Sequence, residues 1–245
     1  MAKIHSNLPF SERMNYPHHI AVIADGNRTR AKEKWLTPMD GHLEGAKNAI
    51  ALVKHLFNTT PIKVFTWWFL STENMTNRSE TELGFIFGIF KLIGNDLDDF
   101  MIEHQISFRR VGSPVGLPDD FLTFLTEKQK KFSFSTDKAI VFAINYGGRD
   151  EILRWIKNIP QNTDLQSLTE ADFSSYLDFW ALPPVDLVIR TKGDVARRTS
   201  GFMARRIGYA ELYFSEKKFP DLDFAEITKI LGRFDSVSDQ RNFWK

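Results

Sequence analysis

The stretch that decides the fold is HHIAVIAD, residues 18–25, a short apolar run that ends at the dipeptide Asp25-Gly26. An apolar run of this length that ends at a turn signal is typical of a buried β-strand. Further runs of the same kind follow along the chain, and with the first they predict six strands: PIKVFTWWFL (61–70), ISFRRVG (106–112), KAIVFAIN (138–145), VDLVIRT (185–191) and AELYFS (210–215).

Helical patterns fill the segments between these strands. In residues 42–57 apolar side chains recur at steps of three and four, which marks one face of a helix. Residues 82–102 are long enough for one helix and are apolar on nearly every side in their first half. Such a helix must be covered on more than one face. Further helices are expected at residues 117–132, 147–159 and 223–234.

Strands that alternate with helices predict an α/β fold with a central, mostly parallel six-stranded sheet covered by helices on both faces. No internal repeat, low-complexity segment or linker rich in Pro, Gly or Ser interrupts the chain. We therefore expect a single domain over residues 1–245, with 1–17 as an N-terminal extension. In such sheets ligands bind outside the carboxyl ends of the strands, so the residues directly after each strand are the candidates for function.

Composition excludes several classes of protein. The chain of 245 residues has 42% hydrophobic residues and a net charge of +1, which fits a globular domain without a strong overall attraction to nucleic acid. Cysteine is absent, which excludes disulfides, thiol nucleophiles and cysteine zinc sites and fits a cytoplasmic location. No segment approaches the roughly 18 apolar residues of a membrane span, so we expect a protein that is soluble or peripheral to a membrane.

Asp25 is the first candidate for chemistry, because it directly follows the first predicted strand. A carboxylate there suits a hard cation such as Mg²⁺, and Gly26 leaves the following amides free to approach a phosphate. The alternative is an ordinary turn residue, since Asp-Gly is common turn chemistry. A phosphatase of the haloacid dehalogenase type would carry a second Asp two positions on, where this chain has Asn27.

Two further clusters follow strands. Ser71, Asn74 and Arg78 come after the second strand, either as an N-cap for the apolar helix or as part of an anion site. Arg190 ends the fifth strand, ahead of an Arg-rich segment, residues 197–206. The planar guanidinium of Arg can donate two hydrogen bonds to a phosphate group, so this segment could bind phosphate. The alternative is a solvent-exposed charged surface, which is the more common role of a run of charged residues. An RNA-binding segment would interleave aromatic residues, and only Phe202 lies here.

Glu211 and His42 are weaker candidates on their own. Glu211 opens the sixth strand and either faces solvent or completes a carboxylate pair with Asp25 around a divalent cation. His42 stands at the start of a predicted helix, where it is either a surface residue or a donor to a phosphate.

The order of these motifs resembles that of the cis-prenyltransferase family, of the undecaprenyl diphosphate synthase type. The matching blocks span about residues 18–224: HIAVIADGN, GH before a helix, LSTEN with NRS, RRVG, AINYGGRDEI, DLVIRT with RTSGF, and YAELYF with FPDLDF. The resemblance implies a homodimer whose sheet and helices enclose an apolar tunnel. It also implies that isopentenyl diphosphate is condensed with an allylic diphosphate, with Mg²⁺ as cofactor, to give a Z-polyprenyl diphosphate, a lipid-carrier precursor.

The resemblance also implies a role for each matching residue. Asp25 and Asn74 are the expected catalytic residues, and Asp25 and Glu211 are the expected metal ligands. The expected substrate-binding residues are Gly26, Asn27, Arg28, Thr29, Arg30, His42, Ser71, Thr72, Glu73, Met75, Arg78, Arg190, Arg198, Thr199 and Ser200.

Several positions depart from the pattern of this family. Thr29 and Arg30 stand where the family usually has Arg and an aromatic residue, so we expect diphosphate contacts to be redistributed to Arg28 or Arg30. Met75 replaces a usual Trp, and the loop between Arg190 and Arg198 is longer by two residues than the common form. The remaining departures are Pro38, Gly201 and Arg205. These changes affect the primer and the product length more than the class of reaction.

Three alternatives remain. The chain is a divergent family member with a short or non-standard product, a non-catalytic partner subunit, or a nucleic-acid module that uses residues 197–206. The second would be expected to lose Asp25 and the Arg residues, and the chain retains them. We expect no nucleic-acid partner, and we expect a peripheral membrane contact for release of the product.

Overall fold

Six parallel strands form one sheet at the centre of the structure, a computed structural model that describes residues 14–161, 163–178 and 181–241. The strand order is β3-β4-β2-β1-β5-β6, and each neighbouring pair of strands is parallel. The predicted α/β sheet is therefore confirmed, although residues 1–13 of the expected N-terminal extension lie outside the described residues. The strands are β1 (His19–Ile23), β2 (Val64–Ser71), β3 (Ser107–Val111), β4 (Ala139–Tyr146), β5 (Leu187–Arg190) and β6 (Glu211–Phe214).

The central strands are buried on both faces. Every residue of β1 and of β4 is buried. Successive side chains of a strand point to opposite faces, so Ile20 and Val22 join the larger hydrophobic core while Ala21 and Ile23 join the smaller one. This double burial explains why the strands read as continuous apolar runs rather than as an alternating pattern.

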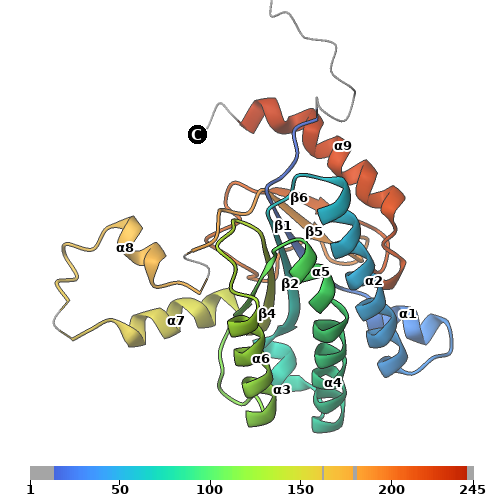
Figure 1. Cartoon of the computed structure of the whole chain (residues 1–245), viewed down its shortest axis with the longest axis horizontal. Coiled ribbons are helices and arrows are strands. Elements are labelled where there is room, and N and C mark those ends of the chain that lie inside the picture. The colour runs from blue at the N-terminus through green and yellow to red at the C-terminus, as the bar shows by residue number, and fades with distance from the viewer. Residues whose placement is uncertain (1–13, 162, 179–180, 242–245) are drawn as a thin grey trace, which may run out of the picture.

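Helices α2 (Pro38–Thr59), α4 (Glu80–Asp96), α6 (Asp119–Lys131) and α9 (Phe224–Arg241) contribute residues to the larger core. Figure 1 shows α4 and α6 alongside one another, while α7 (Gly148–Asn158) and α8 (Glu170–Ser175) extend away from the sheet. Helix α4 contacts α2, α5 and α6, which confirms that this apolar helix is covered on more than one face. Phe90 of α4 is fully buried at the centre of a group of Phe rings that includes Phe69, Phe121 and Phe142.

The helix expected over residues 82–102 is two helices, α4 and α5 (Asp98–Glu103). They meet at Leu97, which is 1% exposed and whose N–H donates to the Ile93 and Asn95 carbonyls. Close to this junction the Lys128 ammonium donates to the Gly94 carbonyl and pairs with Asp98. Sequence patterning joined the two helices because Leu97, the residue between them, is apolar and buried and so continues the apolar positions of α4 across the junction.

Three short helices were not expected from the sequence: α1 (Asn27–Glu33), α3 (Thr72–Asn77) and α8. The Ser71 hydroxyl accepts a hydrogen bond from the Asn74 N–H and caps α3, while α4 has its own cap, Ser79. The N-cap alternative for Ser71 is thus correct, but the helix it caps is α3 rather than the apolar helix. A 3₁₀ turn, η2 (Phe219–Asp221), precedes α9.

Across the described residues, the helices are all too short or too polar to qualify as candidate membrane spans.

Candidate active site

A cleft of about 1050 Å³ opens at the carboxyl ends of β1, β2 and β5. This is the edge of a parallel sheet at which ligands are expected. Asp25, Ser71 and Arg190 follow or end these three strands and all face the cleft. The predicted site residues that line it are Asp25, Gly26, Asn27, Arg28, Thr29, His42, Ser71, Glu73, Asn74, Arg78, Arg190 and Ser200.

An ion pair between Asp25 and Arg190 lies in the wall of this cleft. Arg190 Nη2 donates to Asp25 Oδ2 at 2.9 Å, and its Nη1 donates to Ser200 Oγ at 2.9 Å and to the Arg198 carbonyl at 2.6 Å. The Arg190 side chain is only 7% exposed, whereas that of Asp25 is 35% exposed. Arg190 Nε is buried without a hydrogen-bond partner in the structure. The Arg190 guanidinium is therefore held in place within the wall of the cleft, whereas the Asp25 carboxylate is partly exposed to the space inside the cleft.

Thr191 holds the backbone of Asp25 in place, a role that sequence reasoning missed. Its Oγ1 accepts from the Asp25 N–H at 2.8 Å and lies 2.7 Å from the Asp25 carbonyl, to which it donates. Thr191 is 0% exposed. The sequence held a signal for this role: Thr191 directly follows Arg190, the last residue of β5, and β5 pairs with β1, which Asp25 follows.

Gly26 and Gly45 make room for the start of α1. Gly26 has φ +104, and a Cβ there would lie 2.8 Å from Lys218 Cβ, so both the backbone angle and the space require glycine. A Cβ at Gly45 would lie 2.6 Å from Asn27 Oδ1. That oxygen is buried and has no hydrogen-bond partner in the structure, so Asn27 retains an unused acceptor at the cleft.

Arg30 does not line the cleft, contrary to the expectation that it takes over a diphosphate contact. Its Nη1 lies 2.5 Å from Glu44 Oε2 and its Nε lies 2.9 Å from Asp221 Oδ1. These two carboxylates engage the guanidinium between α2 and η2, while Arg28 and Thr29 of the same helix do face the cleft. The next helical position points elsewhere because successive residues turn by about 100° around a helix axis.

His42 lies in the second turn of α2 and faces Glu82 and Arg78. Its Nε2 donates to Glu82 Oε1 at 3.1 Å, and Arg78 Nε lies 3.6 Å from the same oxygen. Burial, followed by the nearby charges of Arg78 and Arg28, lowers the pKa of His42 below its usual value. The imidazole is therefore neutral at pH 7 and its remaining nitrogen, Nδ1, is an acceptor, so His42 becomes a second donor only when it is protonated.

Helix α3 brings some of its predicted residues to the cleft and turns others away. Ser71, Glu73 and Asn74 line the cleft. Thr72 faces Gly147, where an added Cβ would lie 2.7 Å from Thr72 Oγ1. Met75 packs against the larger hydrophobic core instead. Both lie outside the cleft lining.

Glu211 is not brought together with Asp25 in one chain. It begins β6 and pairs with Leu187, whereas the cleft lies at the other end of these strands, where Arg190 pairs with Phe214. Three residues of strand correspond to about 10 Å. Across the described residues, no group of three or more His, Asp or Glu side chains is placed to hold a metal ion. Arg198 is exposed and contributes its carbonyl rather than its side chain, and Thr199 also lies outside the cleft lining.

Apolar side chains line the rest of the cleft. Trp67, Phe69 and Ile89, from β2 and α4, belong to or pack against the larger core, and Ile86 of α4 is also buried. The cleft thus joins charged groups at the strand ends to an apolar wall. The enclosed tunnel expected from the resemblance stays a prediction. Residues that line the cleft and were not among the predicted site residues include Lys32, Trp35, Leu36, Pro38, Trp68 and Lys192.

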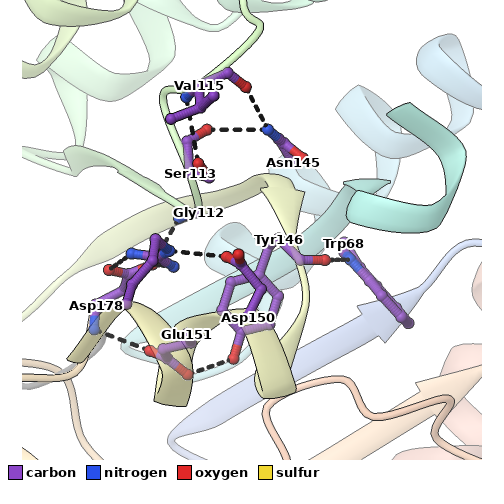
Figure 2. Close-up of polar contacts among 10 residues, drawn as sticks. Trp68, Gly112, Ser113, Val115, Asn145, Tyr146, Asp150, Glu151 and Asp178 are labelled. Carbon is purple, nitrogen blue, oxygen red and sulfur yellow. Dashed lines mark hydrogen bonds and ion pairs between the residues drawn. The ribbon is translucent and has the colours of Figure 1, made fainter. Parts of the chain in front are cut away.

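A buried polar network supports Trp68 (Figure 2), whose Nε1 donates to the Tyr146 carbonyl at 3.0 Å. The Tyr146 hydroxyl donates to Glu151 Oε2 at 2.7 Å, and Glu151 Oε1 accepts from the Asp178 N–H at 2.8 Å. Burial raises the pKa of both Tyr146 and Glu151, so the hydroxyl stays protonated and remains a donor. The network fixes α7 to β4 behind the cleft wall.

Sequence comparison shows the family. The family model described as putative undecaprenyl diphosphate synthase matches residues 23–243. An isoprenyl transferase of Treponema denticola is 38% identical over 203 residues, which cover 83% of this chain and 87% of the relative. An isoprenyl transferase of Fusobacterium nucleatum is 36% identical over 224 residues, covering 90% and 93%.

Solved structures agree with this relationship. Lavandulyl diphosphate synthase from Lavandula x intermedia, in complex with dimethylallyl diphosphate, has a TM-score of 0.83 at 28% identity and covers 90% of this chain and 95% of that one. A probable undecaprenyl diphosphate synthase from Campylobacter jejuni has a TM-score of 0.70 at 28% identity, covering 90% and 96%. With the motif order and the cleft at the strand ends, these matches show that the chain belongs to the undecaprenyl diphosphate synthase family of cis-prenyltransferases, which are enzymes.

Proposed function

We propose that the protein condenses isopentenyl diphosphate with an allylic diphosphate to give a Z-polyprenyl diphosphate. The observation that carries the proposal is the ion pair of Asp25 and Arg190, at 2.9 Å, at one end of a cleft whose wall includes Trp67, Phe69 and Ile89. Fixed charge beside an apolar wall suits a substrate with a diphosphate head and a hydrocarbon tail. Each buried methylene contributes about 0.8 kcal/mol, so the tail is held without directional contacts.

The two diphosphates are assigned to two sides of the cleft. The allylic diphosphate lies beside Asp25 and the start of α1, with Arg28, His42 and Arg78 as the nearby charged or titratable groups. Isopentenyl diphosphate is assigned to Arg190 and Ser200. The unpartnered Arg190 Nε supports this assignment, because an anion would supply the missing acceptor.

The reaction begins when the bond between C1 of the allylic group and its diphosphate oxygen breaks and the electron pair leaves with the diphosphate. The double bond of isopentenyl diphosphate then attacks C1 through C4, and the positive charge passes to C3. Loss of a proton from C2 forms the new Z double bond. Fixed cations stabilise the charge that develops on the leaving group, and one such donor contributes roughly 3 to 4 kcal/mol. We assign Ser71 and Asn74, which line the cleft, to direct the proton that leaves C2 towards the released diphosphate, whose oxygens accept it.

The donor set of the cleft fits Mg²⁺. Mg²⁺ commonly takes one or two protein carboxylates, together with substrate phosphates and water. Asp25 offers one carboxylate, 35% exposed, with Oδ2 bound to Arg190 and Oδ1 outside that ion pair. Asp25 would hold the ion, which when bound would neutralise charge on the diphosphate oxygens. Glu211 lies at the other end of β6, so within one chain it does not join this set.

A homodimer is also proposed. Leu153 and Ile156 of α7 are 54% and 51% exposed, and Leu165 and Tyr176 nearby in sequence are 61% and 47% exposed. Exposed apolar side chains on a helix that extends from the body of the molecule favour a protein contact (Figure 1).

Trp35 and Leu36, 96% and 40% exposed, line the cleft and support a peripheral membrane contact during release of the product.

A second candidate is a condensation with a short or non-standard product. It is favoured by the likeness to lavandulyl diphosphate synthase, at a TM-score of 0.83, and by Thr29 in place of the usual Arg. Both candidates are tested by incubating the protein with radiolabelled isopentenyl diphosphate, Mg²⁺ and allylic diphosphates of five to twenty carbons. We expect label in a lipid product that requires the allylic diphosphate. A product of one addition selects the second candidate, and no labelled product with any primer refutes both.

A further inference from the structure

Lys192 enters the cleft from a strained position in the chain. It follows the buried Thr191 at the end of β5, has φ +59, and lines the cleft. A lysine rarely adopts positive φ, because its Cβ crowds the backbone. Two hydrogen bonds hold the backbone there: Lys192 N–H donates to the Lys217 carbonyl and Gly193 N–H to the Ser215 carbonyl, both at 2.7 Å. The fold thus keeps a long cationic side chain at a position that glycine would occupy without strain.

The Lys192 ammonium is held against α1 by a neutral partner. Its Nζ donates to Thr29 Oγ1 at 2.9 Å, and no carboxylate among the residues that the structure describes lies within ion-pair distance of it. Two other cations of the cleft are partly neutralised, Arg190 by Asp25 and Arg78 by Glu82. The Lys192 ammonium is therefore half-buried, held beside Thr29 by a hydrogen bond, and still able to bind an anion.

Thr29 explains why a cation from another segment is useful at this place. Position 29 faces the cleft but carries a hydroxyl, and Arg30, the expected substitute, is engaged by Glu44 and Asp221. Lys192 reaches Thr29 from the loop after β5, so it places an ammonium directly beside Thr29, in addition to the charges of Arg28 and Lys32 that line the cleft from α1. A diphosphate bound beside Asp25 and Thr29 would lie within reach of this group, which has two further N–H donors.

We propose that Lys192 is a substrate-binding residue that grips the diphosphate of the allylic substrate beside Thr29. The proposal rests on the proposed function for the identity of that substrate, but it concerns the binding of a diphosphate group by this ammonium. Because the contact is to the α1 side of the cleft, it acts on the allylic diphosphate and leaves isopentenyl diphosphate on Arg190 and Ser200.

The test replaces Lys192 with Gly, which removes the ammonium and suits φ +59. We expect the KM for the allylic diphosphate to rise about 10- to 100-fold, the range for a charge-assisted hydrogen bond. The KM for isopentenyl diphosphate should change less than about threefold, and Lys192→Arg should restore most of the affinity. Thermal stability of Lys192→Gly should stay equal or rise, because the substitution relieves backbone strain.

Two controls separate the ammonium from other effects. Gln105→Gly removes a side chain from a residue with a comparable positive φ, +52, at a turn outside the cleft lining. Lys47→Gln removes an exposed charge from α2, also outside the lining. Neither should alter the KM for the allylic diphosphate. Unchanged allylic KM in Lys192→Gly, or an equal rise in both KM values, overturns the proposal.

A binding measurement keeps this inference separate from the proposed function. Inorganic pyrophosphate with Mg²⁺ is titrated into the wild-type protein and Lys192→Gly by calorimetry. Tight binding by the wild type and about tenfold weaker binding by the variant support the role of Lys192, even if no prenyl product forms and the proposed function fails. Equal affinities overturn the role of Lys192, even if prenyl transfer is observed.

Discussion

Asp25 is the residue on which the proposed chemistry depends most. Asp25→Asn keeps the size of the side chain and removes the charge that pairs with Arg190 and that would hold the proposed Mg²⁺. We expect turnover to fall by about 100- to 1000-fold, the effect of removing one electrostatic stabiliser. Steady-state kinetics and circular dichroism measure the loss and confirm the fold. As a control, Asp137→Asn alters an exposed partner of Lys63 and should leave turnover unchanged; wild-type turnover in Asp25→Asn contradicts the assigned role.

His19, in β1, makes stability depend on pH. It is 0% exposed; Nδ1–H donates to the Pro183 carbonyl at 2.9 Å, and Nε2 accepts from the Thr66 hydroxyl at 2.7 Å. Burial lowers the pKa of His19 from 6.5 to about 4. Because the native state holds this imidazole neutral, its contribution is full above pH 6.5 and is lost as the pH falls towards 4, by about 3 kcal/mol in all.

The measurement is the free energy of unfolding in urea between pH 7 and pH 4.5. We expect it to decrease with falling pH in the wild type and to decrease less in His19→Gln, which cannot titrate. Equal slopes for the two proteins would show that His19 is not held neutral by the fold.

At the scale of the element, helix α4 joins the cleft wall to the core. Phe90 is 0% exposed, with ring centroids 4.9 Å from Phe69 and 4.8 Å from Phe142. Phe90→Ala should lower the free energy of unfolding by about 3 to 5 kcal/mol, since it leaves a cavity in the packed core. Leu92 of the same helix is 49% exposed, so Leu92→Ala should cost less than about 1 kcal/mol. Similar losses in the two variants, measured by chemical denaturation, would contradict this packing.

The strands could be predicted from sequence and the short helices could not. Each predicted apolar run overlaps its strand, and only β2 and β4 extend one residue beyond their runs, because a strand buried on both faces leaves a continuous apolar signal. Helices α1 and α3 have 7 and 6 residues, and α8 has 6, which is too short for a helical repeat to be visible. They form from local features, such as the Ser71 cap of α3 and the capping box of Thr169 and Asp172 in α8.

The site shows the same limit. Asp25, Ser71 and Arg190 could be placed because the carboxyl ends of neighbouring parallel strands meet at one edge. Arg30 could not be placed, because its direction depends on Glu44 and Asp221, which are distant in sequence. Glu211 begins its strand and so lies, within one chain, at the edge opposite the residues that follow strands; its role as a metal ligand stays a prediction.

At the scale of the whole molecule, the proposed homodimer makes a prediction for α7. If its exposed apolar residues form the contact, Leu153→Glu combined with Ile156→Glu places two charges in an apolar interface and should shift the protein from dimer to monomer. Size-exclusion chromatography with light scattering measures the mass. Lys157→Glu, an exposed polar position on the same helix, is the matched control and should remain dimeric. A monomeric wild type, or a double variant that stays dimeric, refutes this contact.

The central claim is that the protein extends a prenyl chain in one cleft, in which charged side chains bind the diphosphates and apolar side chains hold the hydrocarbon tail. Mass spectrometry of the products from isopentenyl diphosphate, an allylic diphosphate and Mg²⁺ tests it most directly, with wild type and Asp25→Asn run in parallel. The account predicts products from the wild type that exceed the primer by whole five-carbon units, and almost none from the variant. Wild-type protein that returns every primer from five to twenty carbons unextended would contradict the account.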